Sequence, residues 1–162
     1  MIKTMMLLMT ALVTGSGLTI TSTSFPANGN IPSVYTCEGN NTSPALHIGG
    51  LPTGTKSLAI IVHDPDAPMA GGFTHWVAWN IAPTGDITEN FKGGEQGLNG
   101  AGKAGYMGPC PPSGTHHYHF MIYALDTKLK LDKSTNKAGL EKAMDGHILQ
   151  QGDLIGLYKK VK

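Results

Sequence analysis

Residues 57–68 read Ser57-Leu-Ala-Ile-Ile-Val-His63-Asp64-Pro-Asp-Ala-Pro68, an apolar run followed by two carboxylates and two prolines. A continuous apolar run of this length predicts a strand that is buried on both faces. The two prolines restrict the backbone around the carboxylates. Because Asp-Pro-Asp is often only a turn, these residues by themselves predict a stiff turn at the end of a buried strand.

Further strands and one helix are predicted on both sides of this run. Residues 18–24, 73–81, 117–125 and 154–161 have the composition of strands, and 26–56 reads as loops with short strands between them. A helix is predicted from about Asn136 to Leu149, where Thr135 or Asn136 can cap it. Its apolar residues share one face: Leu140, Ala143, Met144 and Ile148. Many strands with one late helix predict an antiparallel β core with a helical addition.

Composition limits the chain to one globular domain and narrows its chemistry. The 162 residues include 22 glycines, and the formal net charge is +1. No run of like charge exceeds Lys159-Lys160, which argues against nucleic-acid binding. All 12 basic residues are lysines, so the bidentate guanidinium fork is absent. Any anion site must therefore use lysine, histidine or backbone N–H groups.

Residues 1–17 have the layout of a secretory signal peptide. Lys3 precedes an apolar run over 4–13 that is too short to span a membrane, and small residues follow. The alternative is an amphipathic or buried N-terminal segment. The expected division is a signal peptide at 1–17 and a single domain at 18–162, in a periplasmic or secreted protein with no transmembrane segment. In such a protein, Cys37 and Cys110 are either free buried thiols or a disulfide.

Two more segments carry side chains suited to ligand binding. The strand 73–81 includes His75 within Thr74-His-Trp76, although a histidine here is more often structural. The segment 105–120 has three prolines before a run of histidines, and it is expected to present backbone N–H groups, near Gly108 above all, to an anion. His116, His117 and His119 also suggest a metal site. However, alternation along the strand places His117 and His119 opposite Tyr118, and zinc would need a further ligand, so no metal or cofactor is expected.

The glycine-rich segment Gly97-Leu-Asn-Gly-Ala-Gly-Lys-Ala104 nearly matches a phosphate-binding loop of nucleotide hydrolases. Ala104 stands where the motif needs a hydroxyl for magnesium. The prolines and glycines that follow also prevent the helix that the motif must open. The segment therefore does not predict a nucleotide site.

Taken in order, the segments 57–68, 73–81 and 105–120 resemble the phosphatidylethanolamine-binding family, most closely its bacterial Raf-kinase-inhibitor-like branch. The resemblance is carried by Asp64-Pro-Asp-Ala-Pro68, His75-Trp76, Gly108-Pro-Cys-Pro-Pro112 and His116-His-Tyr118, and it covers nearly all of residues 18–162. Further matches are Tyr35-Thr-Cys-Glu-Gly39, Ser43-Pro-Ala-Leu46, Asn99 through Tyr106, and Asp145-Gly-His-Ile148.

The resemblance implies a large antiparallel sheet packed on a smaller one, a C-terminal helix, and an anion pocket at one end of the sheet. The implied pocket wall is Asp64, Asp66, Pro68, His75, Gly108, Cys110, Pro111, His116 and Tyr118. This sequence departs from the family at His117, where an arginine is usual, and it lacks the longer helical C-terminus of eukaryotic members. These departures argue against kinase inhibition. Bacterial relatives suggest a homodimer.

The expected function is binding of a small anionic or phosphorylated ligand, such as phosphate or a phospholipid headgroup. Protonated His75 and His116 would face the anion, and Asp64 or Asp66 would orient an imidazole. Modulation of a protein partner, as in kinase or protease inhibition, is expected by analogy only. The alternative is a phosphoester hydrolase that uses His75, His116 and Asp66, but no nucleophile elbow or triad is present, so an enzyme is not expected. In a third reading the chain is a partner-recognition module with an incidental pocket.

Overall fold

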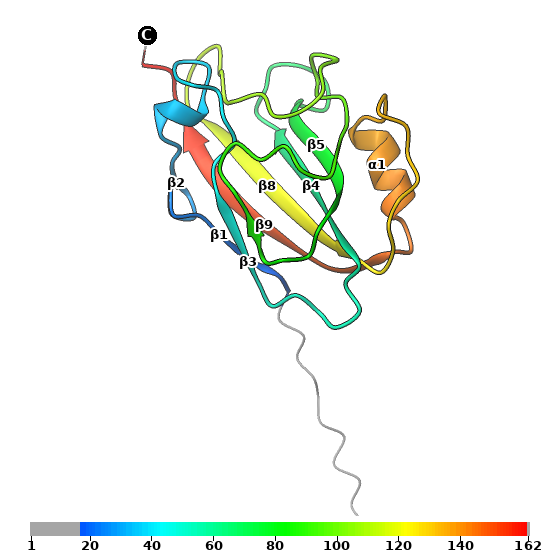
Figure 1. Cartoon of the computed structure of the whole chain (residues 1–162). Helices are drawn as coiled ribbons and strands as arrows, with labels where there is room; N and C mark the ends of the chain where they lie inside the picture. The colour runs from blue at the N-terminus through cyan, green and yellow to red at the C-terminus, as the bar shows by residue number, and fades with distance from the viewer. Residues whose placement is uncertain (1–16, 162) are drawn as a thin grey trace, which may run out of the picture.

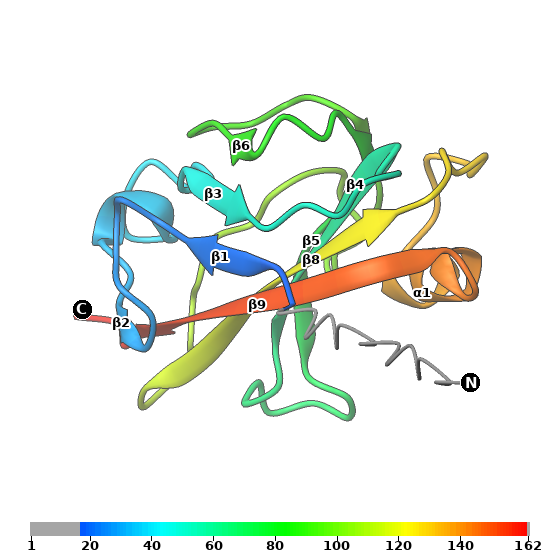
Figure 2. The same cartoon turned by 90° about the horizontal axis from the view of Figure 1, so that it is seen from below.

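The computed structural model describes residues 17–161, which form two sheets (Figures 1 and 2). The larger sheet has the strand order β2 (Gly29–Asn30), β9 (Ile148–Tyr158), β8 (His116–Leu125), β4 (Ser57–Asp64), β5 (Phe73–Ile81) and β7 (Glu95–Gln96). The smaller sheet has the order β1 (Thr19–Thr21), β3 (Leu46–Gly49) and β6 (Asp86–Ile87). All strand pairs of the two sheets are antiparallel except β2 beside β9.

Two short helical elements complete the fold: the 3₁₀ turn η1 (Ser33–Tyr35) and the helix α1 (Lys137–Met144). These elements confirm the predicted mainly β fold, with a large sheet, a smaller sheet and one helix near the C-terminus. Among the described residues, no helix has the length and apolar character needed to cross a membrane.

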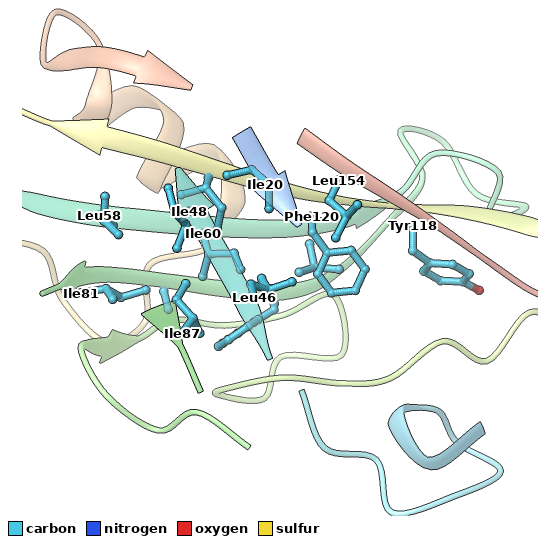
Figure 3. Packing of buried hydrophobic residues seen from close by; sticks show 14 of the residues in the cluster. Ile20, Leu46, Ile48, Leu58, Ile60, Ile81, Ile87, Tyr118, Phe120 and Leu154 are labelled. Carbon is cyan, nitrogen blue, oxygen red and sulfur yellow. The ribbon is translucent and has the colours of Figure 1, made fainter. Parts of the chain in front are cut away.

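The main core lies between the two sheets (Figure 3). Its side chains come from the inner faces of β4, β5 and β8 and from all three strands of the smaller sheet, with Ile60, Trp76 and Phe120 fully buried. A second cluster lies on the outer face under α1, where Leu140 and Met144 cover Ile61 and Trp79. β4 is therefore buried on both faces, as its apolar run predicts.

The alternation predicted for β8 is confirmed. Tyr118, Phe120, Ile122 and Ala124 lie in the main core, whereas Met121 and Tyr123 pack with the outer cluster. This arrangement follows from the period-2 geometry of a strand.

The predicted helix 136–149 is too long at its C-terminal end. Asn136 caps the helix as expected, its side chain accepting a hydrogen bond from the Gly139 N–H at 3.1 Å. The helix stops at Met144 because Asp145 is non-helical and Gly146 has a positive φ of 77°. Ile148 therefore does not share the helix face: it begins β9, which starts earlier than the predicted strand 154–161 and ends at Tyr158.

The first strand is shorter than the predicted 18–24. Only Thr19–Thr21 pairs with β3. The Ser22 hydroxyl then donates to the Ala45 carbonyl at 2.7 Å and accepts from the Ser24 N–H at 3.1 Å. Such local side-chain bonds compete with the strand ladder, which explains the early end.

Candidate functional site

The end of β4 and the beginnings of β5 and β8 meet at one end of the larger sheet, because these neighbouring strands are antiparallel. A cavity of about 270 Å³ lies there. Loops after β4 and before β8 close it. Of the predicted wall residues, the structure brings together eight around this cavity: Asp64, Pro68, His75, Gly108, Cys110, Pro111, His116 and Tyr118.

His116 and Asp64 form a buried pair on the cavity floor. The His116 Nδ1 lies 2.7 Å from the Asp64 Oδ2, and the two side chains are only 8% and 3% exposed. The Asp64 Oδ1 accepts a second hydrogen bond, from the Asp66 N–H at 2.9 Å. A carboxylate that accepts at both oxygens holds the His116 proton on Nδ1, so Nε2 is the ring nitrogen left for a ligand.

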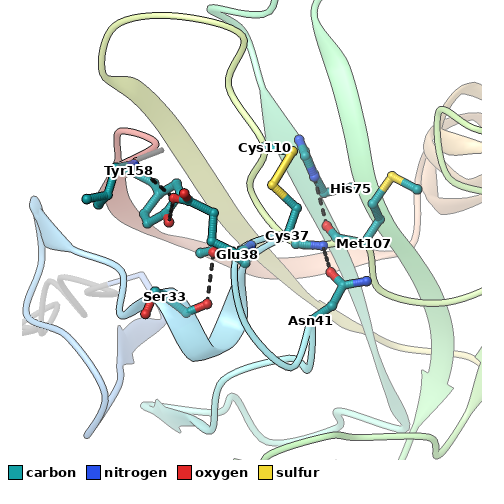
Figure 4. Close-up of a disulfide and its surroundings, with 11 residues drawn as sticks. Ser33, Cys37, Glu38, Asn41, His75, Met107, Cys110 and Tyr158 are labelled. Atoms are coloured by element: carbon teal, nitrogen blue, oxygen red, sulfur yellow. Dashed lines mark hydrogen bonds between the residues drawn. A yellow bond between two sulfur atoms is a disulfide. The ribbon is translucent and has the colours of Figure 1, made fainter.

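His75 enters the cavity from a bulge in β5. The register of β4 against β5 shifts between the pairs Val62–Trp76 and His63–Thr74, so His75 has no partner in β4. The bulge places His75 against Tyr118, with ring centroids 5.2 Å apart. The His75 Nδ1 lies 2.8 Å from the Met107 carbonyl oxygen (Figure 4), which must accept, so Nδ1 carries the proton.

Burial decides the charge state of His75. The residue is 4% exposed, and loss of hydration lowers its pKa below the ordinary value of 6.5, although the Met107 carbonyl and Asp64 oppose this effect. His75 is therefore neutral at pH 7. With the proton on Nδ1, its Nε2 then presents a lone pair.

Tyr118 supplies a hydroxyl donor in the cavity wall. Its oxygen is buried and makes no hydrogen bond of good geometry within residues 17–161. Burial first, and the negative charge of Asp64 second, raise the pKa of Tyr118, so the hydroxyl keeps its proton. Buried phenols usually have a partner. Asp64 and the backbone of Cys110 act on this oxygen, and a ligand in the cavity would be a further acceptor for the hydroxyl.

Asp66 is the one predicted wall residue that does not line the cavity. Its Oδ2 accepts from the His117 N–H at 2.8 Å and lies 2.7 Å from the His117 Nδ1. These bonds lower the pKa of Asp66. His117, which stands where the family usually has arginine, thus holds Asp66 at the exposed rim.

The loop before β8 is joined to the segment after η1 by the disulfide Cys37–Cys110, with the two Cα atoms 5.4 Å apart (Figure 4). Beside it, the Gly108 N–H donates to the Asn41 Oδ1 at 2.6 Å, and the Cys37 N–H donates to the Pro109 carbonyl at 3.1 Å. The disulfide reading of the two cysteines is confirmed. The Gly108 N–H itself is therefore already bound by Asn41, and the expectation that backbone N–H groups near Gly108 bind an anion stays a prediction for its neighbours.

Five lining residues escaped the sequence analysis: Ala67, Met69, Phe73, Met107 and Pro112. All five are adjacent or nearly adjacent to predicted wall residues, which is the signal that was available. They are apolar, and together with Pro68 and Pro111 they surround the polar floor with an apolar rim. Met69 is 54% exposed there.

A larger cavity, of about 480 Å³, lies between α1 and the glycine-rich segment 97–104. Its charged groups pair with each other, the Lys137 Nζ lying 2.9 Å from the Glu141 Oε1. The Asn99 carboxamide binds the N–H groups of Ala101 and Lys103, and the Gly100 N–H donates to the Thr74 carbonyl. The segment that resembles a phosphate loop therefore uses these donors internally.

Among residues 17–161, no three histidine, cysteine or acidic side chains gather closely enough to hold a metal ion. His117 and His119 bind separate carboxylates, Asp66 and Asp153, at 2.7 Å each. The three histidines of β8 thus each contact a different aspartate, Asp64, Asp66 or Asp153.

Comparison with known proteins finds extensive similarity. A family model described as phosphatidylethanolamine-binding protein matches residues 21–159. A UPF0098 protein of Pyrococcus horikoshii is 53% identical over 150 residues, which cover 86% of this chain and 75% of that protein. A UPF0098 protein of Methanothermobacter thermautotrophicus is 49% identical over 145 residues, which cover 84% of this chain and 95% of that protein.

Solved structures show the same fold. A phosphatidylethanolamine-binding protein homologue from Chlamydia trachomatis has a TM-score of 0.85 and 39% identity, covering 89% of this chain and 98% of its own. E. coli YbcL, a member of the mammalian PEBP family, has a TM-score of 0.83 and 32% identity, covering 90% and 99%. With the family match over residues 21–159, the similarity to the UPF0098 proteins and the shared fold, the chain belongs to the phosphatidylethanolamine-binding protein family.

Proposed function

We propose that the cavity binds a small anionic, phosphorylated head group through His75, His116 and Tyr118. The observation that carries the proposal is the pair of imidazoles in one cavity, each bound through Nδ1, whereas Nε2 makes no hydrogen bond to another residue of the described part of the chain. Asp64 and the Met107 carbonyl fix the orientation of the two rings before a ligand binds.

Proton uptake couples to binding at this site. A neutral imidazole whose proton is on Nδ1 presents only a lone pair at Nε2, which repels an anion. The protonated ring presents an N–H with a full positive charge, and hydrogen bonds of this kind are about twice as strong as neutral ones. Because burial lowers the pKa of His75, its contribution to anion binding develops below the ordinary value of 6.5.

Binding is favoured over hydrolysis because no serine, threonine or free cysteine is found among the described lining residues. Both cysteines form the disulfide, and Ser113 and Thr115 are exposed and outside the cavity. Asp66, the base of the alternative hydrolase, is bound to His117 at the rim. A hydrolase would still show turnover of a phosphoester panel that is lost in a His116→Gln variant; we expect no such difference.

The test of binding is calorimetry with inorganic phosphate and phosphoethanolamine from about pH 5.5 to about pH 8.5, the range in which histidine titrates. Affinity should fall as pH rises. His75→Gln and His116→Gln should each lower the affinity at the acid end by about tenfold or more, the worth of one hydrogen bond to a charged group.

The matched control for these variants is His47→Gln. His47 makes the same Nδ1 contact with a carboxylate, Asp86 at 2.8 Å, but it is exposed and lies on the smaller sheet. It should leave both the affinity and its pH profile unchanged. An affinity that does not depend on pH and is equal in all three variants would contradict the proposal.

We also propose that the protein is exported to the periplasm or secreted, on the basis of the sequence at its N-terminus. Residues 1–16 lie outside the described part of the chain. The exposed disulfide supports this location, because disulfides persist in oxidising compartments. The intact mass of protein recovered from the native host should lack residues 1–17. Full-length protein in the cytoplasmic fraction would be the opposite result.

A further inference from the structure

We propose that Asp64 is a charge filter that makes the cavity select singly charged phosphodiesters over doubly charged phosphomonoesters. This inference rests on the proposed function and names the class of ligand that the same site would take. The Asp64 carboxylate orients His116, which binds the anion, but its own negative charge weakens anion binding.

The inference begins with the charges around the cavity. Among its described lining residues, only the carboxyl group of Asp64 and the imidazoles of His75 and His116 are acidic or basic groups that can become charged without ionising a phenol, and no lysine lines the cavity. The charged groups that act on His75 are Asp64 and His63, and those that act on Tyr118 are Asp64 and Asp66. At the rim, Asp66 pairs with His117. The chain has no arginine, so the cavity has no permanent cation.

The net charge of the cavity follows from this inventory. With His75 neutral, the pair of His116 and Asp64 carries a charge of zero when His116 is protonated and −1 when it is not. Protonating both imidazoles brings the total only to +1. One negative charge on the ligand can therefore be balanced, but a second cannot.

The position of Asp64 makes the second charge costly. Its side chain is 3% exposed, so little water screens it, and both of its oxygens are held in place, by His116 and by the Asp66 N–H. Like charges within a few ångströms repel by several kcal/mol at the effective dielectric of a protein site, on the order of 20. A dianion meets this repulsion twice, whereas a monoanion meets it once.

The apolar rim points to the same class of ligand. Pro68, Met69, Phe73 and Pro111 lie around the polar floor. A diester replaces one ionisable oxygen of the phosphate with a second substituent. That substituent can contact apolar side chains, whereas a charged oxygen in the same place would lose its hydration without a partner.

The experiment compares methyl phosphate with dimethyl phosphate by calorimetry on the protein without its N-terminal segment 1–17 and on the full chain. Because the second pKa of a phosphate monoester is about 6, methyl phosphate is mainly a dianion at about pH 7 and a monoanion at about pH 5. Dimethyl phosphate is a monoanion at both. The wild-type protein should bind dimethyl phosphate at least about tenfold more tightly at about pH 7, and this ratio should shrink toward one at about pH 5.

Asp64→Asn should reduce the ratio at about pH 7 by about tenfold, because asparagine keeps the shape and can still accept from the Asp66 N–H, whereas an uncharged amide NH2 then faces the His116 Nδ1 in place of the carboxylate. The control is Asp153→Asn, whose carboxylate also lies 2.7 Å from a histidine Nδ1, that of His119, but on the outer face of the sheet. It should leave the ratio unchanged. If a variant fails to fold, the comparison of the two probes on the wild-type protein at two pH values still tests the inference.

The outcomes separate the two proposals. If the wild-type protein binds methyl phosphate as tightly as dimethyl phosphate at about pH 7, Asp64 is not a charge filter, although the cavity remains an anion site. If Asp64→Asn folds and keeps the wild-type ratio, the selectivity has another source and the inference is equally overturned. If neither probe binds between about pH 5 and about pH 7, the proposed function itself is wrong.

Discussion

At the scale of single residues, the histidines divide into two groups by the partner of Nδ1. Five bind a carboxylate through this nitrogen: His47, His116, His117, His119 and His147. The other two, His63 and His75, meet the Thr74 hydroxyl and the Met107 carbonyl instead. Burial lowers the pKa of both. Among the described residues, the close contacts between an aspartate and a basic side chain thus all come from histidines, and the cavity contains one histidine of each group.

Residue identities in the cavity follow from the sequence, but their chemical states do not. The motif 64–68, His75 and the segment 108–118 are enough to place eight lining residues. What no pattern gives is which ring nitrogen holds the proton, because this depends on a carbonyl 32 residues away for His75 and on a carboxylate 52 residues away for His116. The sequence likewise does not reveal that the Gly108 N–H donates to Asn41, which lies 67 residues away in the chain.

At the scale of elements, the disulfide is the covalent link that holds the part of the pocket loop after Pro109. Hydrogen bonds anchor residues 106–109: Tyr106 binds Tyr35, Met107 binds His75, Gly108 binds Asn41, and Pro109 binds Cys37. From Pro111 to Thr115 no such bond joins the loop to the rest of the described chain. Pro111 and Pro112 line the cavity in this part.

Reduction of the disulfide, or Cys37→Ser with Cys110→Ser, should therefore loosen the cavity wall. The loop closed by the disulfide spans 73 residues, for which chain entropy gives a loss of stability of up to about 4 kcal/mol. Anion affinity should also fall, because the lining residues Pro111 and Pro112 are then no longer held by the disulfide. Urea unfolding, calorimetry with inorganic phosphate and amide exchange of residues 110–115 measure the three effects.

The control for the chemical treatment is the double serine variant exposed to the same reductant, which should not change further. Thiol titration of the denatured, unreduced protein should find no free thiol. Unchanged exchange and affinity after full reduction would mean that packing alone positions Pro111 and Pro112.

At the scale of the whole molecule, the fold was more predictable than the limits of its elements. The apolar run of β4 and the alternation of β8 fix which faces are buried, because burial on these strands follows period 2. The helix end and the start of β9 were misplaced because Ile148 and Leu149 continue an apolar pattern that suits either element. The turn at Gly146, whose φ is 77°, resolves the ambiguity only in three dimensions.

Stability of the whole chain should fall as pH drops below about 6.5. The folded-state pKa values of His75 and His63 are lowered from 6.5 by burial, so as pH falls the unfolded chain takes up these protons first. Proton uptake by the unfolded state favours unfolding, and the loss develops below the unfolded value of 6.5. Asp66 and Asp132, whose pKa values are lowered from 3.8, add a further loss only near and below that value. The interval from about pH 7 to about pH 5 therefore isolates the histidines.

Urea unfolding at these two pH values, in a buffer without phosphate, measures the effect. His75→Gln and His63→Gln should each reduce the loss of stability on acidification, whatever they do to stability at neutral pH, because each removes a group that is buried neutral. His147→Gln, at an exposed pair with Asp126, is the control. Adding phosphate should reverse part of the loss in the wild-type protein, since a ligand that binds only the folded, protonated state stabilises it. A stability equal at both pH values in the wild-type protein would show that His75 and His63 are not held neutral by the fold, and the proton coupling of the cavity would have to be abandoned with it.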